Sequence, residues 1–580
     1  MTMNQTLSKI LALVCLSCSF GIYSQNKSVN ISKQATICNP INLSYRFCLD
    51  VPSRREAADP TMVTFKNEYY LFASKSGGYF HSKDLIHWDL IITQDLPVED
   101  YAPTAVVMKD TLYFMASKNE APLTIYKTAD PKSGKWQIAN AAFPIGMTDP
   151  DLFVDDDGRM YFYYGCSDKN PIYAVELDAK TLNPIGTPVA LFNSNKKEYG
   201  WERFGDYNEK DDSPWVEGAW MTKHNGKYYL QYAVPGTQFK SYCDGLYVAD
   251  KPLGPFTVAA HNPVSAKPEG FIAAAGHSST FQDIYGNYWH ISTMTISQKH
   301  MFERRLGLFP TFFDNDGVMY VYTGFGDFPY KVPNKKISSP EELFPKWMLL
   351  SYNKPIAASS ELQGHPARYA ADEEIRTYWS AKTGNKGEWI AMDLQKMSTI
   401  NAVQINFAEN NTKTMGRKPG IYYQYLLEYS TDGVTWKSLA NNTLNKTDVP
   451  HDYLELKVPV KARYIRLTNY HMADGTFALA GLRVFGNGGG KTPVVVGKAE
   501  AVRSQIDRCI VKMSWAPKSD AIGYSIRYGT QKDKLYSNYQ ILGKNSVTIG
   551  NLNSRQKYYF VIDAFNENGI TKGEQVIELN

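Results

Sequence analysis

Three acidic residues in three separate segments have the side chains needed for acid–base chemistry on a sugar. They are Asp59 in A-A-D-P-T-M, Asp149 in M-T-D-P-D-L-F and Glu217 in W-V-E-G-A-W. Hydrolysis of a glycosidic bond needs one carboxylate as base or nucleophile and one carboxylic acid that protonates the leaving oxygen. The alternative for Asp59 and Asp149 is a structural role, because Asp-Pro commonly opens a turn. The three acids together favour the chemical interpretation.

A repeated strand pattern explains how such distant acids could meet. Aromatic-rich runs recur in the first 340 or so residues, at 68–72, 112–115, 160–163, 227–230 and 287–290. Most of them follow a polar turn, which predicts five β-hairpin units. All-β units at unequal spacing are typical of propeller blades with different insertions. Blades around one axis would bring an acid from each of three units to the centre.

Residues 35–340 resemble glycoside hydrolase family 43. The resemblance depends on A-D-P near the start, D-P-D-L-F-V-D-D-D-G, and E-G-A-W followed by N-G-K-Y-Y-L-Q-Y. It implies a five-bladed β-propeller that hydrolyses with inversion, with Asp59 as general base and Glu217 as general acid. Asp149 would orient Glu217 and keep its pKa high, since a nearby negative charge raises the pKa of an acid. Inversion also requires the acid and the base to lie about 6.5–9.5 Å apart.

The same resemblance assigns a histidine to the pocket. His277 in A-G-H-S-S-T is similar to the family's histidine near the propeller axis, which in several members binds a metal ion or water. Ser278 replaces the second glycine of the family's G-H-G pattern. A purely structural histidine is the alternative. We therefore expect no required cofactor, with calcium near His277 as the other outcome.

An arginine pair resembles the late arginine that these enzymes direct toward the sugar or the base. Arg304 and Arg305 are adjacent, and adjacent side chains on a strand point to opposite faces, so only one of them can face the axis. A surface ion pair with Glu303 is the alternative.

Two further features bear on ligands. Trp88 and Trp215 are candidates for a wall that stacks on sugar rings, as are Trp201 and Trp220, although packing accounts for most aromatic residues. The acidic run 155–157 lacks the ligand spacing of an EF-hand and predicts a hairpin turn.

Length and charge limit the classes of function. A chain of 580 residues is too long for one core, which predicts several domains. The net charge of +4 and the lack of a basic run exclude nucleic acid as an expected partner.

The N-terminus predicts export. Lys9 precedes an apolar stretch that ends near Ser24, so residues 1–24 read as a signal peptide, and the stretch is too short for a membrane span. The mature protein would be periplasmic or secreted, without a transmembrane segment. Lipid anchoring at Cys18 is the alternative, although C-L-S fits a lipobox poorly.

Five cysteines follow the predicted signal. An exported chain could pair Cys38 with Cys48, and the odd total leaves at least one thiol free. No spacing among them resembles a zinc site.

Two further β-sandwiches are expected. Residues 345–487 resemble a discoidin-like (coagulation factor type C) module, on motifs such as Y-S-T-D-G-V-T-W and A-R-Y-I-R-L. Residues 493–580 resemble a fibronectin type III domain, with strands around V-K-M-S-W and Y-Y-F-V-I. The glycine-rich segment 486–490 between them predicts a flexible linker.

These patterns predict an exported inverting glycosidase that releases a pentose from plant-type polysaccharides or oligosaccharides, as an α-L-arabinofuranosidase or a β-xylosidase. An exo-β-galactosidase of the same family is a less favoured alternative. A rival from another class is a catalytically silent carbohydrate-binding propeller, although none of the three acids is lost. A retaining fructan enzyme comes last.

Overall fold

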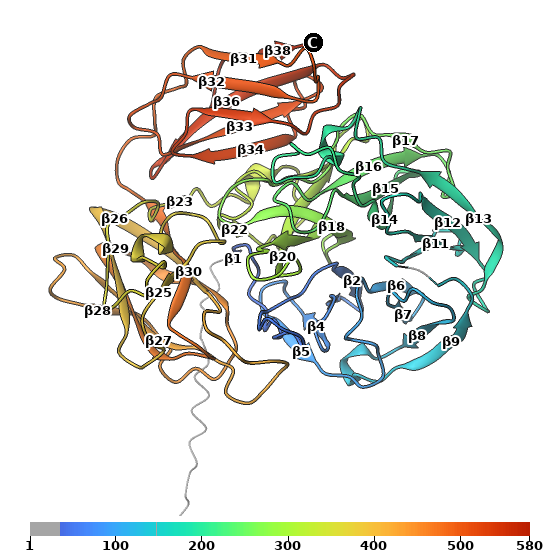
Figure 1. Ribbon diagram of the computed structural model, residues 1–580, viewed down its shortest axis with the longest axis horizontal. Coiled ribbons are helices and arrows are strands. Elements are labelled where there is room, and N and C mark those ends of the chain that lie inside the picture. The colour runs from blue at the N-terminus through green and yellow to red at the C-terminus, as the bar shows by residue number, and fades with distance from the viewer. Residues whose placement is uncertain (1–34, 147) are drawn as a thin grey trace, which may run out of the picture.

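The computed structural model describes residues 35–146 and 148–580, so the predicted signal peptide lies outside the described residues. The described chain is all-β, and its helices are single turns: η1 (Pro131–Ser133), η2 (Gly200–Glu202), η3 (Pro340–Glu342) and η4 (Ala367–Ala370). No helix in this part of the chain has the length and apolar character needed to cross a membrane. Figure 1 shows a ring of strands, a second body beside it (gold to orange) and a third above it (red).

The ring consists of antiparallel strands connected in sequence order. Three sheets have four strands each, and β14 to β21 form one larger sheet in which β16 and β18 share a single parallel pair, Cys243 with Ala275. The strands are β2 (Thr61–Phe65), β3 (Glu68–Phe72), β4 (Tyr79–Ser82), β5 (Asp89–Ile91); β6 (Thr104–Met108), β7 (Thr111–Met115), β8 (Leu123–Thr128), β9 (Gln137–Phe143); β10 (Asp151–Val154), β11 (Met160–Tyr164), β12 (Ile172–Leu177), β13 (Pro184–Phe192); β14 (Glu217–His224), β15 (Lys227–Val234), β16 (Cys243–Ala249), β17 (Thr257–Val258); β18 (Ala273–Gln282), β19 (Tyr288–Thr295), β20 (Arg304–Phe313) and β21 (Met319–Val321).

The innermost strands close the ring. Contacts run from β2 to β6, β6 to β10, β10 to β14, β14 to β18 and back from β18 to β2. The tight turns that the sequence predicted lie at the C-terminal ends of these strands. Lys66 and Asn67 between β2 and β3, and Asn225 and Gly226 between β14 and β15, all have positive φ, as the favoured hairpin turns require. Residues 155–158 likewise form the turn between β10 and β11.

Aromatic side chains fill the space between neighbouring sheets. Phe72 lies 5.3 Å from Phe114 of the next sheet between ring centroids, and both belong to one buried cluster. These contacts explain why the sequence places aromatic runs in the strands: each run packs against the adjacent unit.

The second body is a β-sandwich-type domain built mainly from one large sheet. Its strands are β23 (Met348–Leu349), β24 (Ile356–Ala358), β25 (Trp379–Ser380), β26 (Trp389–Phe407), β27 (Gln424–Ser430), β28 (Lys437–Asn441), β29 (His451–His471) and β30 (Ala478–Asn487). Trp379 is fully buried in its core, as expected from the sequence. A short pairing of β1 (Thr36–Ile37) with β22 (Tyr330–Lys331) lies between this domain and the ring (Figure 1).

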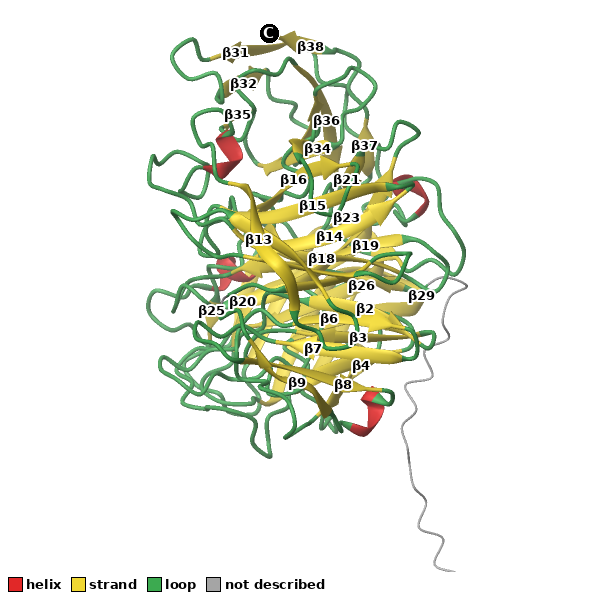
Figure 2. Cartoon of the chain, turned by 90° about the vertical axis from the view of Figure 1, so that its right-hand side faces the viewer, coloured by secondary structure: helices red, strands yellow, loops and turns green. Residues whose placement is uncertain are grey.

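The third body has two facing sheets. One contains β31 (Ala499–Arg503), β32 (Val511–Trp515) and β35 (Ser546–Ile549), and the other β33 (Gly523–Gly529), β34 (Ser537–Leu542), β36 (Tyr558–Asn566), β37 (Gly569–Thr571) and β38 (Ile577–Leu579). Trp515 is buried between them. Figure 2 shows this domain at one end of the molecule.

The three bodies pack against one another through specific contacts. Arg483 of the second domain is buried and donates to Glu373 and to the carbonyl of Asp327. Tyr536 of the third domain stacks on Tyr320 at 3.9 Å.

Two expectations from the sequence need correction. The glycine-rich segment is hydrogen-bonded rather than free, since Gly488 donates to the Glu567 carbonyl and Gly490 to the Asn568 side chain. Cys38 and Cys48 are not paired: all five described cysteines are free thiols. Cys38 lies beside the Asp327 carbonyl, and Cys48 donates to Glu56.

Candidate active site

Three of the predicted site residues lie at or near the starts of inner strands, and a fourth lies within one. Glu217 is the first residue of β14, while Asp59 and Asp149 each lie two residues before β2 and β10. His277 lies in β18 where the pairing register is irregular between Gly276 and Ser279. Because these strands contact one another around the ring, the acids from three distant segments share one cavity.

This cavity has a volume of about 340 Å³, in the usual range for a small-ligand site. Of the residues predicted from sequence, Asp59, Asp149, Glu217, Trp215, His277 and Arg304 line it. The rest of the lining comes from Tyr101, Ser117, Thr148, Cys166, Phe204, Gly236, Thr237, Gln238, Met301 and Phe302.

Asp59 is held as a carboxylate. Ser74 donates to its Oδ2 at 2.6 Å, and Arg304 Nη1 lies 3.1 Å from Oδ1. Burial acts to raise the pKa of Asp59, but the charges of Arg304 and His277 and the Ser74 hydrogen bond outweigh burial, so the pKa lies below its ordinary value. This side chain therefore accepts a proton only weakly from bulk solvent and stays ionised at neutral pH.

Asp149 and Glu217 form an acidic pair on the other side of the cavity. Carboxylate oxygens of the two residues and the Cys166 sulfur all lie within 4.8 Å of one another. The pKa of Asp149 is raised to about 7, mainly by burial. The charge of His277 and the Gly218 N–H act to lower this pKa, whereas the negative charges of Glu217 and Asp59 raise it further. The Asp149 carboxyl, next to Glu217, therefore retains a proton close to neutral pH.

Glu217 is oriented by two donors. Tyr242 donates its hydroxyl to Oε1, and the Cys166 thiol lies 3.2 Å from Oε2. Burial and the neighbouring acids raise the pKa of the Cys166 thiol, so it stays protonated and able to donate.

His277 links the two sides of the cavity. Its Nδ1 lies 3.3 Å from Asp59 and 3.7 Å from Asp149. Burial acts to lower its pKa, but the surrounding carboxylates, Asp59 first, raise it above the ordinary value. A charged imidazole here balances the acids on either side.

The backbone at this centre is strained. Asp59, Asp149 and His277 have φ values of 49°, 56° and 45°, in the left-handed region that residues with side chains seldom adopt. Strain of this kind persists where the surrounding structure imposes it, and it is concentrated at functional sites.

The arginine pair divides between two environments. Arg304 faces the cavity, where it also bonds Glu56 at 2.8 Å and Thr237 at 3.1 Å. Arg305 points the other way, to Glu409 and His451 of the second domain. Arg305 is therefore corrected from a substrate-binding candidate to an interdomain residue, because the alternation along β20 admits only one of the two to the cavity.

The tryptophan candidates also divide. Trp215 lines the cavity with 43% of its surface exposed. Trp88 instead packs beside a buried hydrophobic cluster outside the cavity, which removes it from the substrate-contact set. Trp201 is fully buried and stacks on Tyr199, and Trp220 donates to the Thr280 carbonyl.

The groups around His277 do not suit calcium. Calcium takes six to eight oxygen ligands, whereas His277 is flanked by two carboxylates, one of which is already neutralised by Arg304. Among the described residues, the one group with clustered ligand atoms includes a thiol. No step of the chemistry below depends on a metal.

Several residues at this site were not singled out by sequence reasoning. Glu56 lies three residues before Asp59 and anchors Arg304, and Cys166 lies beside Asp149 because the β10–β11 hairpin pairs Asp151 with Tyr163. The hairpin register was the available signal for Cys166. Ser74 and Tyr242 carry no such local signal, because only the closed ring places them at the acids.

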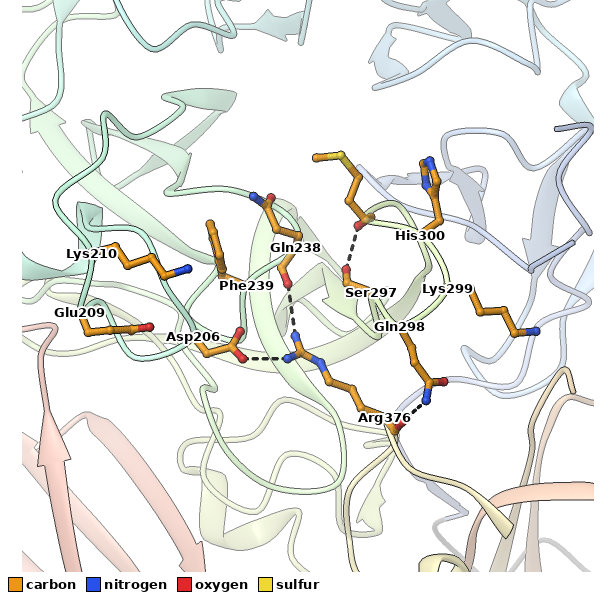
Figure 3. A pocket seen from close by; sticks show the side chains of 11 residues that line it. Asp206, Glu209, Lys210, Gln238, Phe239, Ser297, Gln298, Lys299, His300 and Arg376 are labelled. Carbon is orange, nitrogen blue, oxygen red and sulfur yellow. Dashed lines mark hydrogen bonds and ion pairs between the residues drawn. The ribbon is translucent and has the colours of Figure 1, made fainter. Parts of the chain in front are cut away.

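Figure 3 shows the side chains that line a second cavity, of about 510 Å³. Gln238 and Met301 line both. Its other lining residues are Asp206, Glu209, Lys210, Phe239, Ser297, Gln298, Lys299, His300 and Arg376.

Comparison with known families agrees with this geometry. Residues 52–319 match the model of glycosyl hydrolases family 43, and residues 355–480 match the F5/8 type C domain. The second body is thus a discoidin-type domain, as the sequence predicted.

Curated relatives match part of this chain. A xylosidase/arabinosidase of Butyrivibrio fibrisolvens is 24% identical over 268 residues, covering 40% of this chain and 48% of the relative. A β-D-galactofuranosidase of Aspergillus niger is 30% identical over 266 residues, covering 39% of this chain and 72% of the relative. A β-xylosidase of Xylanibacter ruminicola is 30% identical over 161 residues, covering 25% of this chain and 46% of the relative. The chain thus spans about half the length of the first and third of these relatives.

A solved structure, "Bacteroides ovatus Xyloglucan PUL GH43B", aligns with 78% of this chain and 98% of its own at 16% identity and a TM-score of 0.42.

Proposed function

Since this chain belongs to family 43 of the glycosyl hydrolases and is a glycoside hydrolase, we propose that it releases a terminal pentose with inversion, as an α-L-arabinofuranosidase or a β-xylosidase. The substrates would be plant-type polysaccharides or oligosaccharides. The names of its relatives, which include xylosidases and arabinosidases, support this choice.

The observation that carries the proposal is the difference between the two sides of one cavity. Asp59 is ionised beside Arg304, while Asp149, the immediate neighbour of Glu217, holds a proton near neutral pH. An inverting hydrolase needs this combination of one base and one acid.

The mechanism assigns each group a step. Asp59 accepts a proton from a water molecule as that water attacks the anomeric carbon. Glu217 donates its proton to the leaving oxygen, and Asp149 supplies the neighbouring negative charge and orients Gly218, whose N–H it accepts at 3.1 Å. His277 and Arg304 stabilise the carboxylate of Asp59 until it takes this proton.

The architecture belongs to the same proposal. The cyclic contacts of β2, β6, β10, β14 and β18 support a five-bladed propeller, with the single β16–β18 pair as a contact between two blades. The two-sheet strand order of the third body supports a fibronectin type III domain acting as a spacer. Export through the segment 1–24, to the periplasm or outside the cell, remains our proposal from the sequence.

The test is release of p-nitrophenol from α-L-arabinofuranoside, β-xyloside, β-galactoside and β-D-galactofuranoside substrates. We expect the wild type to cleave a pentoside and Asp59→Asn to lose about 100- to 10,000-fold in kcat/KM. Glu217→Gln should lose less on these aryl glycosides than on oligosaccharides, because p-nitrophenolate leaves without a proton. Full activity in either variant would overturn the roles. Inactivity of the wild type on all substrates, with retained binding in a glycan array, would favour a silent binding propeller.

The stereochemical course is tested separately. We expect NMR of the early product to show the anomer opposite to that of the substrate. A product with retained configuration would rule out the water-activating role of Asp59.

A further inference from the structure

The second cavity continues directly from the catalytic cavity. Gln238 and Met301 line both, and the rings of Phe204 in the first cavity and Phe239 in the second lie 5.0 Å apart between centroids. The two cavities therefore share part of their lining, so a ligand longer than one sugar in the catalytic cavity would lie beside the second.

The second cavity suits a hydroxyl-rich ligand. Most of its lining is charged or carries an amide, and Phe239 and Met301 are its two large apolar side chains. Lys210 Nζ lies 5.7 Å from the centroid of the Phe239 ring, and neither Lys210 nor Lys299 belongs to an ion pair in the described part of the chain, so both ammonium groups can donate to a ligand. Glu209, Lys210, Gln298 and Met301 are exposed, so a chain lying here could continue into solvent.

Both domains build this cavity. Arg376 comes from the discoidin-type domain, and it donates to Asp206 at 2.8 Å and to the Gln238 carbonyl at 3.2 Å (Figure 3). Gln298 in turn donates to the Arg376 carbonyl. Arg376 therefore holds together two loops of the propeller-type domain.

Hydrogen bonds within the loop 297–303 hold its conformation. Glu303 accepts the backbone N–H groups of Gln298 and Lys299, and Ser297 donates to the Met301 carbonyl at 2.8 Å. A binding surface that is already ordered loses less entropy when its ligand arrives.

We propose that the second cavity binds the sugar units on the leaving-group side of the cleaved bond, so that the preferred substrate is an oligosaccharide or polysaccharide rather than a small glycoside. The proposal depends on the function proposed above. Arg376 is a positioning residue of this subsite, and Lys299 is a contact residue.

The test compares two substrates that release the same sugar. One is the p-nitrophenyl pentoside that the wild type cleaves, and the other is xylotetraose or an arabinoxylo-oligosaccharide. We expect Lys299→Ala and Arg376→Ala to lower kcat/KM at least tenfold on the oligosaccharide, mainly through KM, and less than threefold on the aryl glycoside. Equal losses on the two substrates, or no loss on either, would overturn the subsite.

A matched control is Arg463→Ala. Arg463 lies in the same domain and also forms a 2.8 Å ion pair, with Asp393, outside both cavities. Arg463→Ala should leave kcat/KM unchanged on both substrates. If Arg376→Ala fails to fold, Lys299→Ala and Arg376→Lys remain, and we expect the lysine variant to recover part of the oligosaccharide activity.

Binding without turnover separates the two proposals. Calorimetry with the Glu217→Gln protein and xylotetraose or the arabinoxylo-oligosaccharide should show binding that Lys299→Ala weakens at least tenfold. That result would support the subsite even if the assigned acid–base roles fail. Binding that is unchanged by Lys299→Ala would overturn the subsite even if hydrolysis is observed.

Discussion

Arg304 and Asp59 form a buried ion pair, with Nη1 of the arginine 3.1 Å from Oδ1 of the aspartate. Glu56 anchors the other end of the guanidinium at 2.8 Å. One carboxylate thus positions the arginine, and the arginine keeps the second carboxylate ionised. Two segments separated by more than two hundred residues produce the base of this site.

The first prediction concerns pH. The pKa of Asp59 lies below the value of about 3.9 that is usual for an aspartate. Its carboxylate therefore stays ionised down to about pH 3.9, and activity is lost only at lower pH. Asp149 loses its proton as pH rises through about 7, which removes the proton held beside Glu217, so activity declines above that pH. We expect a bell-shaped profile of kcat/KM with these limits. An alkaline optimum above pH 8 would contradict the assignment.

The second prediction removes the charge beside the base. Arg304→Met leaves the burial of Asp59 uncompensated, so the acidic limb of kcat/KM should move upward by about one to three pH units. Thr237→Val is the control, because it removes a neutral hydrogen bond to the same guanidinium. An acidic limb that stays in place in Arg304→Met would show that Asp59 is not the base.

The third prediction tests the acidic pair. Asp149→Asn should lower kcat about 100-fold and move the basic limb to lower pH, because it removes the carboxyl that holds a proton near neutral pH beside Glu217. Asp151→Asn is the control: Asp151 is a buried carboxyl two residues away that bonds the Met221 N–H and does not line the cavity. An unchanged basic limb in Asp149→Asn would exclude the tuning role.

The fourth prediction uses a close approach at the centre. A Cβ on Gly218 would lie 2.8 Å from His277 Cγ and 3.1 Å from the Ala233 Cβ, in a backbone with φ of 57°. Gly218→Ala should therefore displace the imidazole and lower activity at least tenfold. Gly226→Ala is a matched control, since Gly226 also has positive φ and its Cβ would meet nothing within 4 Å. Equal activity in the two purified variants would show that the His277 position is unimportant.

The fifth prediction concerns the two domains. Glu409 of the discoidin-type domain binds Arg55 at 3.0 Å and Arg305 at 3.2 Å, and the neighbours of these arginines are Glu56 and Arg304. Glu409→Gln leaves a buried cation short of a partner, so urea denaturation should show a loss of about 3 kcal/mol in the free energy of unfolding. Glu428→Gln breaks a more exposed ion pair in the same domain and should cost about 1 kcal/mol or less. Equal stability of the two variants would show that the ion pairs of Glu409 do not stabilise the packing of the two domains.

The sequence by itself determined which residue types could act and which local structures carry them. Asp59, Asp149 and Glu217 were identified from short motifs, and the polar turns at Lys66-Asn67 and Asn225-Gly226 predicted hairpins, because both signals are local in the chain. The buried Trp379 was also predictable, since apolar residues in strands seek a core.

Only the tertiary structure decided which residues meet. It selected Arg304 rather than Arg305 for the cavity, placed Trp215 there and Trp88 elsewhere, and brought Ser74 and Tyr242 to the acids. It also kept Cys38 and Cys48 apart and ordered the glycine-rich segment. These cases have one physical reason: each depends on strand pairing and domain packing between segments that are distant in sequence. The burial and the neighbouring charges that set the pKa values depend on the same packing.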